Sequence, residues 1–222
     1  MKPAVTRWFD LGLNVACIIV LAVLAYAGLR KGGFVVSAWT QWRTARAESK
    51  KIAAAWDTLG ALGARLDAGP GPVQIVEFSD YQCPFCKQEH FVLRALLDSL
   101  PTLGIGYRHL PNERHPAARG AALAAICAER AGRFREMHRS LFETMEWQTD
   151  TNWVKLAESA GIADIQNFEA CLRDPAASQR LNEDVKLGER LGVTATPGFV
   201  GRRGRVAGLV SSGGLLRLAE GD

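Results

Sequence analysis

Several features that mark nucleic-acid-binding, fibrous and repeat proteins are missing from this sequence of 222 residues. Residues 71–222 carry almost no net charge, with 18 Lys and Arg against 19 Asp and Glu, which argues against a nucleic-acid-binding surface. The chain contains no internal repeat and no low-complexity tract. With 48% hydrophobic and 23% charged residues, its composition excludes a disordered, collagen-like or coiled-coil protein. The length allows one sizeable domain with an appendage.

Histidine is scarce, and the histidines do not have the spacing of a metal site. They are His90, His109, His115 and His138. His90 could be combined with Cys83 and Cys86 into a zinc site, but the sequence places no fourth ligand beside them. We therefore expect neither a metal nor an organic cofactor.

One long uncharged segment lies near the start of the chain. Residues 11–29 contain no charged side chain, and at about 1.5 Å per residue they are long enough to cross the ~30 Å hydrocarbon core of a bilayer. We predict a transmembrane anchor over these residues, preceded by an N-terminal tail at residues 1–10. A cleaved signal peptide is the alternative, because Ala25-Tyr26-Ala27 supplies a small-residue cleavage site. Cys17 lies inside the run and is interpreted as a small apolar residue.

The segment that follows the anchor has the composition of a connector. Residues 30–68 are expected to form a juxtamembrane stalk, helical at about 45–59, where Ala, Lys and Glu are frequent. Gly69-Pro70-Gly71-Pro72 would break any helix. The folded domain is therefore expected to cover residues 69–222.

The beginning of this domain has the pattern of a βαβ unit. Residues 73–78 form an apolar run with β-branched residues, which is typical of a buried strand. A helical pattern then reaches Leu100, and residues 105–110 predict a second strand. Cys83-Pro84-Phe85-Cys86 lies at the turn from the first strand into the helix.

That turn suits a redox-active cysteine pair. Cys83 falls at a helix N-terminus, where unpaired N–H groups and the helix dipole favour an anion, so the pKa of its thiol should fall. Cys86 lies one helical turn further along and is expected to be shielded. We expect Cys83 to carry the attack and Cys86 to resolve the mixed disulfide. Glu77, on the preceding strand, is either a buried acid that exchanges protons with Cys86 or an ordinary strand-end acid.

The segments EFSDYQCPFC and GVTATPGFVG, about 110 residues apart, resemble the DsbA-like branch of thiol–disulfide oxidoreductases, which have the thioredoxin fold. The resemblance covers about residues 65–222. It implies an α/β thioredoxin fold with an inserted helical domain at about residues 114–190. It also implies that Pro197 is the cis-proline facing the cysteine pair, that Thr196 tunes redox behaviour and substrate release, and that Glu77 is the buried acid of the family.

The expected insertion contains two further cysteines. Helical patterns predict helices at about 117–130, 133–146, 151–160, 166–173 and 176–191. Some DsbA-like relatives carry a structural disulfide there, so Cys127 and Cys171 are either a structural disulfide or two buried free thiols. After Pro197, residues 198–200 and 206–208 predict a hairpin, and residues 215–220 a final helix.

The resemblance implies an enzyme that oxidises dithiols of exported proteins through the Cys83–Cys86 disulfide, and the uncharged run at residues 11–29 predicts that it is tethered to the membrane. Its expected partners are reduced or unfolded exported proteins, a membrane protein that reoxidises the active site, and the membrane itself through residues 11–29, but no nucleic acid. A reductase or isomerase, or a non-catalytic thioredoxin-like binding module, are the alternatives. Because a dithiol oxidant belongs in an oxidising space, we expect the catalytic domain on the extracytoplasmic, periplasmic side of the cytoplasmic membrane.

Overall fold

The computed structural model describes residues 18–23, 26, 37–56, 59, 63–67, 69 and 71–220. The chain divides into two compact units, Met1–Ala47 and Glu48–Asp222. In the first unit, the described residues 18–23, 26 and 37–47 are helical. Within the described ranges, no helix has the length and apolar character needed to span a bilayer. Most of the predicted anchor at residues 11–29 lies outside these ranges.

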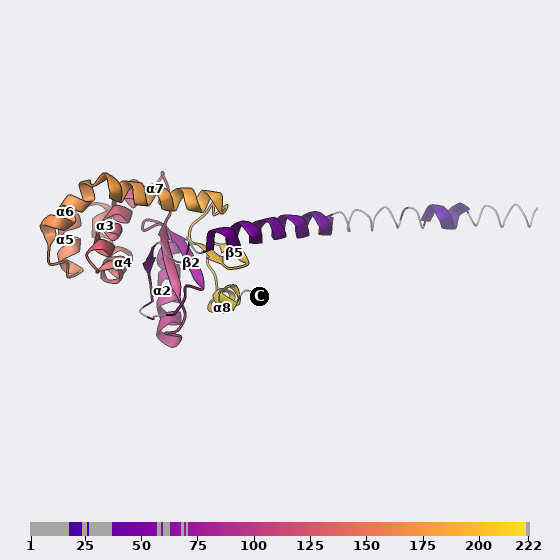
Figure 1. Ribbon diagram of the computed structural model, residues 1–222, viewed down its shortest axis with the longest axis horizontal. Helices are drawn as coiled ribbons and strands as arrows, with labels where there is room; N and C mark the ends of the chain where they lie inside the picture. Colours follow the sequence, from indigo (N-terminus) through magenta and orange to yellow (C-terminus); the bar gives the residue numbers. More distant parts are fainter. Residues whose placement is uncertain are drawn as a thin grey trace, which may run out of the picture. The chain divides into compact units, whose positions relative to one another are not determined.

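A five-stranded mixed sheet organises the second unit (Figure 1). Its strands are β1 (Ala64–Arg65), β2 (Ile75–Ser79), β3 (Ile105–His109), β4 (Gly198–Gly201) and β5 (Gly204–Ala207), in the order β1-β3-β2-β4-β5. β2 is parallel to β3 and antiparallel to β4. Every residue of β2, β3 and β4 is buried, as expected where helices cover both faces of a sheet.

The helix α2 (Pro84–Ser99) connects β2 to β3 and completes the predicted βαβ unit. Its apolar side chains Leu93 and Leu96 pack in a core cluster with Ile75 of β2 and Ile105 of β3. The C-terminal helix α8 (Ser212–Glu220) adds Leu215 to the same cluster. The cysteine pair therefore sits on a helix that is fixed against the sheet over its length.

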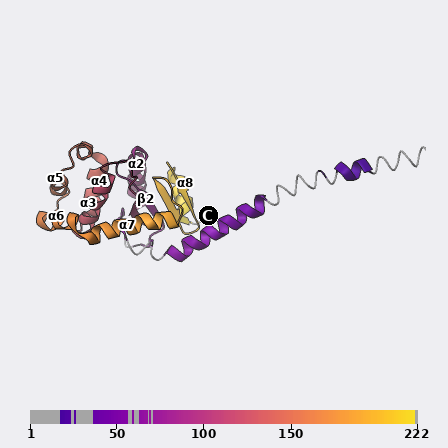
Figure 2. The ribbon, with the colours of Figure 1, turned by 90° about the horizontal axis from the view of Figure 1, so that it is seen from above.

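A helical insertion separates β3 from β4, which confirms the expected thioredoxin-like fold with an inserted domain. It consists of α3 (Ala118–Arg130), α4 (Phe134–Glu143), the 3-10 helix η1 (Glu146–Gln148), α5 (Trp153–Ser159), α6 (Ile165–Arg173) and α7 (Pro175–Arg190). Figures 1 and 2 show α3 to α6 gathered beside the sheet, with α7 running from them back along it. A buried ion pair between Arg108 of β3 and Asp184 of α7, 3.0 Å apart, ties this long helix to the sheet.

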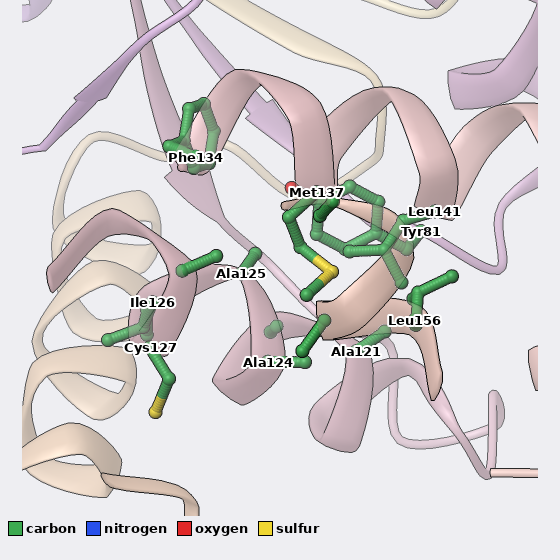
Figure 3. Packing of buried hydrophobic residues seen from close by; sticks show 14 of the residues in the cluster. Tyr81, Ala121, Ala124, Ala125, Ile126, Cys127, Phe134, Met137, Leu141 and Leu156 are labelled. Atoms are coloured by element: carbon green, nitrogen blue, oxygen red, sulfur yellow. The ribbon is translucent and has the colours of Figure 1, made fainter. Parts of the chain in front are cut away.

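Small side chains on α3 let the insertion pack closely against the turn that carries the cysteines. Ala121, Ala124 and Ala125 of α3 are fully buried, and Met137 and Leu141 of α4 pack over them (Figure 3). Tyr81 from the β2–α2 turn enters the same cluster (Figure 3). The insertion and the active-site turn thus share one hydrophobic core.

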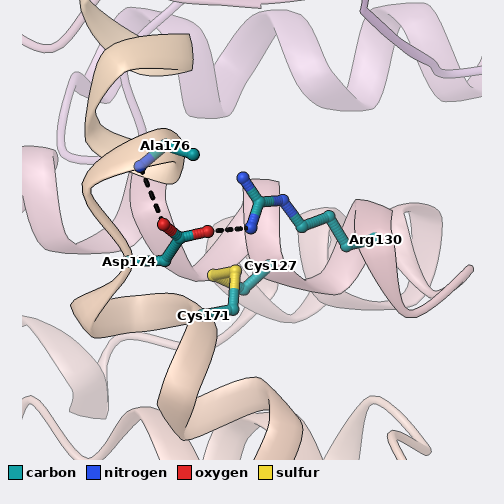
Figure 4. Close-up of a disulfide and its surroundings, with 5 residues drawn as sticks. All are labelled: Cys127, Arg130, Cys171, Asp174 and Ala176. Carbon is teal, nitrogen blue, oxygen red and sulfur yellow. Dashed lines mark hydrogen bonds and ion pairs between the residues drawn. A yellow bond between two sulfur atoms is a disulfide. The ribbon is translucent and has the colours of Figure 1, made fainter.

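Cys127 of α3 and Cys171 of α6 form a disulfide (Figure 4). Beside it, Arg130 pairs with Asp174 at 2.6 Å, and Asp174 also caps α7 by accepting a hydrogen bond from the Ala176 N–H. Of the two alternatives left by the sequence, the structure has the disulfide. The disulfide joins two helices of the insertion and does not involve a strand of the sheet.

The predicted start of the domain at residue 69 is too late. Ile52, Trp56 and Leu59, placed in the expected stalk, are almost fully buried and pack against β2, β4 and the end of α7. The strand β1 also precedes residue 69 and pairs with β3. The compact unit begins at Glu48. The Lys and Glu residues of this segment indicated a solvated helix, but its apolar residues lie three and four positions apart and form one buried face.

Candidate active site

The two cysteines lie where β2 leads into α2. Cys83 is the N-cap of α2, and Pro84 is its first residue, a position where no backbone donor is needed. Cys83 is 6% exposed and Cys86 is 0% exposed, and both are free thiols. The geometry therefore gives only Cys83 a route to a substrate.

The second segment singled out in the sequence meets the cysteines from the other side. The Thr196–Pro197 peptide bond is cis and leads directly into β4. Cys83 Sγ lies 3.4 Å from the Thr196 carbonyl oxygen, although 113 residues separate them. The Pro197 carbonyl accepts a hydrogen bond from the Gly208 N–H at 2.8 Å, which fixes this loop to the end of β5. The structure thus brings Cys83, Thr196 and Pro197 together.

The two thiols have opposite pKa shifts. The pKa of Cys83 is lowered to about 5, chiefly by a hydrogen bond from the Cys86 thiol and further by the backbone N–H groups of Cys86 and Phe85 at the helix start. The pKa of Cys86 is raised for three reasons. Burial disfavours its thiolate, and the hydrogen bond to Cys83 holds its proton. The charge of an ionised Glu77 also disfavours a second negative charge on Cys86. At neutral pH the reduced site therefore holds a Cys83 thiolate beside a Cys86 thiol.

Glu77 lies on β2, the strand that leads into the cysteine turn, and is 1% exposed. Burial raises the pKa of its carboxyl to about 8, a hydrogen bond with Ser79 opposes the rise, and the charge of Glu89 adds to it. The carboxyl therefore keeps its proton at neutral pH in most molecules. Glu77 also contributes to the raised pKa of Cys86 through its charge.

Sequence reasoning missed a second buried acid, Glu89 of α2. It is 0% exposed, and its Oε2 accepts a hydrogen bond from the Val210 N–H at 3.1 Å, which holds the segment after β5. The available signal was its position three residues after Cys86, on the side of α2 that faces the core. A carboxylic acid among core positions is costly unless it is neutral or hydrogen-bonded.

Sequence reasoning also missed Asp80, which determines the shape of the turn before Cys83. Its Oδ1 accepts a hydrogen bond from the Gln82 N–H at 2.8 Å. Its Oδ2 accepts from the Asn112 N–H at 2.8 Å and lies 2.7 Å from His115 Nδ1. The turn is therefore tied to the chain that leaves β3, so the cysteines keep a fixed position between the sheet and the insertion.

Three of the four histidines, His90, His109 and His138, lie in one cluster of aromatic rings, and His115 lies apart from them. His90 and His138 contact each other, His115 contacts Asp80, and His109 lies in β3. Among the residues that the structure describes, no group of three or more His, Cys, Asp or Glu side chains is arranged to hold a metal ion.

Comparison with known proteins points to one family. A family model of the DSBA-like thioredoxin domain matches residues 74–215. The chain is 34% identical over 135 residues to the Na(+)/H(+) antiporter NhaA 3 of Salinispora tropica, a match that covers 60% of this chain and 21% of the antiporter. It is 25% identical over 138 residues to disulfide bond formation protein D of Bacillus subtilis, covering 57% of this chain and 61% of that protein. The chain therefore spans about a fifth of the length of the antiporter relative.

The fold is also similar to a solved structure. The crystal structure of a thioredoxin-like oxidoreductase from Silicibacter pomeroyi superimposes with a TM-score of 0.65 and 26% sequence identity. The superposition covers 74% of this chain and 95% of the other. The similarity includes most of the sheet domain and its insertion, well beyond the cysteine motif.

Proposed function

This chain belongs to the DSBA-like thioredoxin family of thiol–disulfide oxidoreductases, and from that membership we propose that it oxidises protein dithiols with the Cys83–Cys86 pair. The observation that carries the oxidising direction is the stabilised Cys83 thiolate, whose pKa lies at about 5. A disulfide becomes a stronger oxidant when its reduced form is stabilised. The relative from Bacillus subtilis, named as a disulfide bond formation protein, supports the same direction.

The reaction begins when a substrate thiolate attacks Cys83 Sγ in the disulfide form. The Cys83–Cys86 bond breaks, and its electron pair leaves on Cys86, which takes a proton from Glu77 because the raised pKa of Cys86 disfavours the thiolate. The second substrate thiolate then attacks the substrate sulfur of the mixed disulfide. Cys83 leaves as a thiolate, for which its low pKa makes it a good leaving group.

We propose that the Thr196–Pro197 segment and the side chain of Phe85 receive the substrate. Thr196 presents its backbone beside Cys83, where an extended peptide can add as a strand. Phe85, between the two cysteines, is 54% exposed and offers an apolar contact next to the reacting sulfur. These contacts are to the backbone and to apolar groups, which suits clients of varied sequence.

We further propose that the domain works on the extracytoplasmic side of the cytoplasmic membrane, tethered through residues 11–29. The uncharged run in the sequence supports the tether. The Cys127–Cys171 disulfide supports the compartment, because such bonds persist in oxidising spaces. Reduced or unfolded exported proteins would then be the substrates, and a membrane protein would reoxidise Cys83 and Cys86.

The test is the reduction potential of the full chain, measured from the oxidised fraction of Cys83 and Cys86 in glutathione buffers. We expect a value nearer to the roughly −120 mV of DsbA than to the roughly −270 mV of thioredoxin. A value near that of thioredoxin would make the protein a reductase. A chain without a reversible couple would be a binding module and would overturn the proposal.

Two variants test the assignment of Cys83 as the attacked cysteine and Cys86 as the resolving cysteine. Cys86→Ala should accumulate a mixed disulfide with a reduced client at Cys83, because the resolving thiol is gone. Cys83→Ala is the matched control and should trap nothing. Trapping by Cys83→Ala would reverse the assigned roles.

A further inference from the structure

A line of hydrogen-bonded side chains leads from the turn before Cys83 to the surface. Tyr81 Oη is 3.2 Å from His138 Nδ1, and His138 Nε2 is 3.2 Å from His90 Nδ1. His90 Nε2 is in turn 3.3 Å from Glu143 Oε1. Tyr81 comes from the turn after β2, His90 from α2, and His138 and Glu143 from α4. The line therefore crosses the boundary between the sheet domain and the insertion.

The outer end of the line determines the direction of every hydrogen bond in it. Arg94 Nη1 lies 2.5 Å from the same Glu143 oxygen, and a carboxylate paired in this way can only accept. Burial lowers the pKa of His90 and of His138, so both imidazoles are neutral and each has one donor and one acceptor nitrogen.

The donor and the acceptor of each remaining hydrogen bond follow from the bond to Glu143. His90 donates through Nε2 to Glu143, which leaves its Nδ1 as an acceptor. His138 must donate to that acceptor through Nε2, which leaves its own Nδ1 to accept from the Tyr81 hydroxyl. All three hydrogen bonds therefore donate toward Glu143, so in this state the line can pass a proton outward. Passing a proton inward requires both imidazoles to change tautomer and the Tyr81 hydroxyl to turn.

The two ends of the line lie in different environments. Tyr81, His138 and His90 are 3%, 5% and 6% exposed, whereas the side chain of Glu143 is 31% exposed. A surface cavity of about 560 Å³ between α2 and α4 is lined in part by His90 and His138. Solvent therefore reaches the line at Glu143 and, through the cavity, beside His90 and His138, while Tyr81 is enclosed by the core.

At the inner end, Tyr81 packs in one core cluster with Tyr107 and Cys86. The ring of Tyr107 lies 5.7 Å from that of Tyr81, and Tyr107 of β3 is the register partner of Glu77 on β2. Ser79 lies two residues after Glu77 on β2, and therefore on the same face of the sheet.

The hydroxyls of Tyr107 and Ser79 are free to turn. Ser79 Oγ and Tyr107 Oη are buried, and neither has a partner of full hydrogen-bond geometry. Hydroxyl hydrogens rotate to suit their surroundings, so these groups can turn between Tyr81 and the Glu77–Cys86 pair.

We propose that Tyr81, His138, His90 and Glu143 form a relay that exchanges protons between solvent and the buried Cys86–Glu77 pair. The proposal rests on the proposed function. When the disulfide is reduced, its two electrons come from the substrate sulfurs, Cys86 takes up one proton, and Cys83 stays a thiolate. Glu77 supplies that proton and is reprotonated along the relay after both imidazoles have changed tautomer. Reoxidation sends one proton outward along the hydrogen bonds as they stand in this structure. The substrate thiols release two protons in all, so one proton remains in solvent.

The test compares two histidines of the same ring cluster in the full chain. His138→Phe removes the central member of the relay but keeps a flat, buried ring. His109→Phe is the matched control, because His109 packs against Tyr81 and Tyr107, is equally buried, and lies outside the hydrogen-bonded line. The measurements are the reduction potential and the steady-state rate of oxidation of a model dithiol peptide, with glutathione disulfide as the terminal oxidant.

We expect His138→Phe to lower the turnover rate about 100-fold, the lower end of the range for a lost proton-transfer step, and to leave the reduction potential unchanged. The rate should recover in part when imidazole is added as a mobile proton carrier, and His109→Phe should keep both quantities. Tyr81→Phe and Glu143→Gln break the relay at its two ends and should repeat the loss, so the test stands even if His138→Phe does not fold.

Two outcomes would overturn the relay. One is a normal rate in Tyr81→Phe and Glu143→Gln, and the other is an equal loss in His109→Phe, which would assign the effect to packing. Failure of the proposed function has a different signature, because the unmodified chain itself would then lack a reversible Cys83–Cys86 couple.

Discussion

Cys83 owes its reactivity to its neighbours more than to its exposure. The hydrogen bond from Cys86 is the largest cause of its low pKa, ahead of the backbone N–H groups at the start of α2. The helix N-terminus, which the sequence already indicated, is therefore only part of the explanation. A thiol in the same place without Cys86 would be a weaker acid.

Alkylation of the reduced protein tests this account of the Cys83 thiol. The rate of reaction with iodoacetamide should rise with pH around a midpoint near 5, where the thiolate forms. In Cys86→Ala the midpoint should move upward, because the main hydrogen-bond donor is lost. Mass spectrometry of the labelled peptide gives the rate, and Cys127 and Cys171 stay unlabelled in their disulfide. An unchanged midpoint in Cys86→Ala would leave the helix N-terminus as the dominant cause.

Glu77 should make the stability of the fold depend on pH. Its pKa is raised from an ordinary 4.5 to about 8 in the folded protein, so the folded state keeps a proton that the unfolded chain releases. Proton linkage then lowers the free energy of unfolding as the pH rises from about 4.5 to about 8. The full shift from 4.5 to about 8 would correspond to at most ~5 kcal/mol at about 1.4 kcal/mol per pH unit.

Glu77→Gln removes this titration and should be about as stable as the unmodified protein near pH 4.5 and more stable near pH 8. Urea unfolding at a series of pH values measures the difference. The exposed acid Glu113 provides the control, because Glu113→Gln should follow the unmodified protein at every pH. A difference that does not widen with pH would mean that Glu77 titrates normally in the folded state.

The helices and strands of the domain could largely be predicted from local patterns. The helix expected to reach Leu100 is observed as Pro84–Ser99, and the five helices of the insertion appear at nearly their expected positions. The spacing of apolar residues predicts that each helix exists, and Pro or Gly predicts where many of the helices end.

The side-chain line from Tyr81 to Glu143 could not be predicted in this way. Tyr81 and His138 are 57 residues apart, and His90 and His138 are 48 residues apart. Each looks like an isolated polar residue in its own element. Only the packing of α4 on α2 brings them together, and no local pattern specifies that packing.

The disulfide between α3 and α6 should stabilise the insertion without changing the chemistry of the site. It closes a loop of 44 residues, and constraining the unfolded chain in this way contributes up to ~4 kcal/mol. The double variant Cys127→Ala, Cys171→Ala should therefore unfold at a lower denaturant concentration. The reduction potential of Cys83 and Cys86 should not move, because their pKa values have no contribution from the second pair. An unchanged unfolding midpoint would contradict a structural role for the bond.

At the scale of the whole molecule, the sheet domain depends on residues that lie before the segment matched by the family model. The family model begins at residue 74, whereas the compact unit begins at Glu48. Ile52, Trp56 and Leu59 cover an apolar surface formed by β2, β4 and the end of α7. Without this cover, Val76 and Val200, both 0% exposed here, would face water.

Two tryptophans in the N-terminal helical segment differ in burial, and mutating each tests which part of that segment belongs to the folded core. Trp56 is 6% exposed and lies in the core, whereas Trp42 is 55% exposed. Trp56→Ala in the full chain should lower the free energy of unfolding by about 3–5 kcal/mol, because it leaves a cavity in a packed core. Trp42→Ala should change it by at most about 0.5 kcal/mol, as for other surface substitutions. Denaturant unfolding followed by circular dichroism measures both. Equal, small losses would mean that residues 48–59 do not fold with the sheet, and the domain would then begin at residue 69, as its composition first indicated.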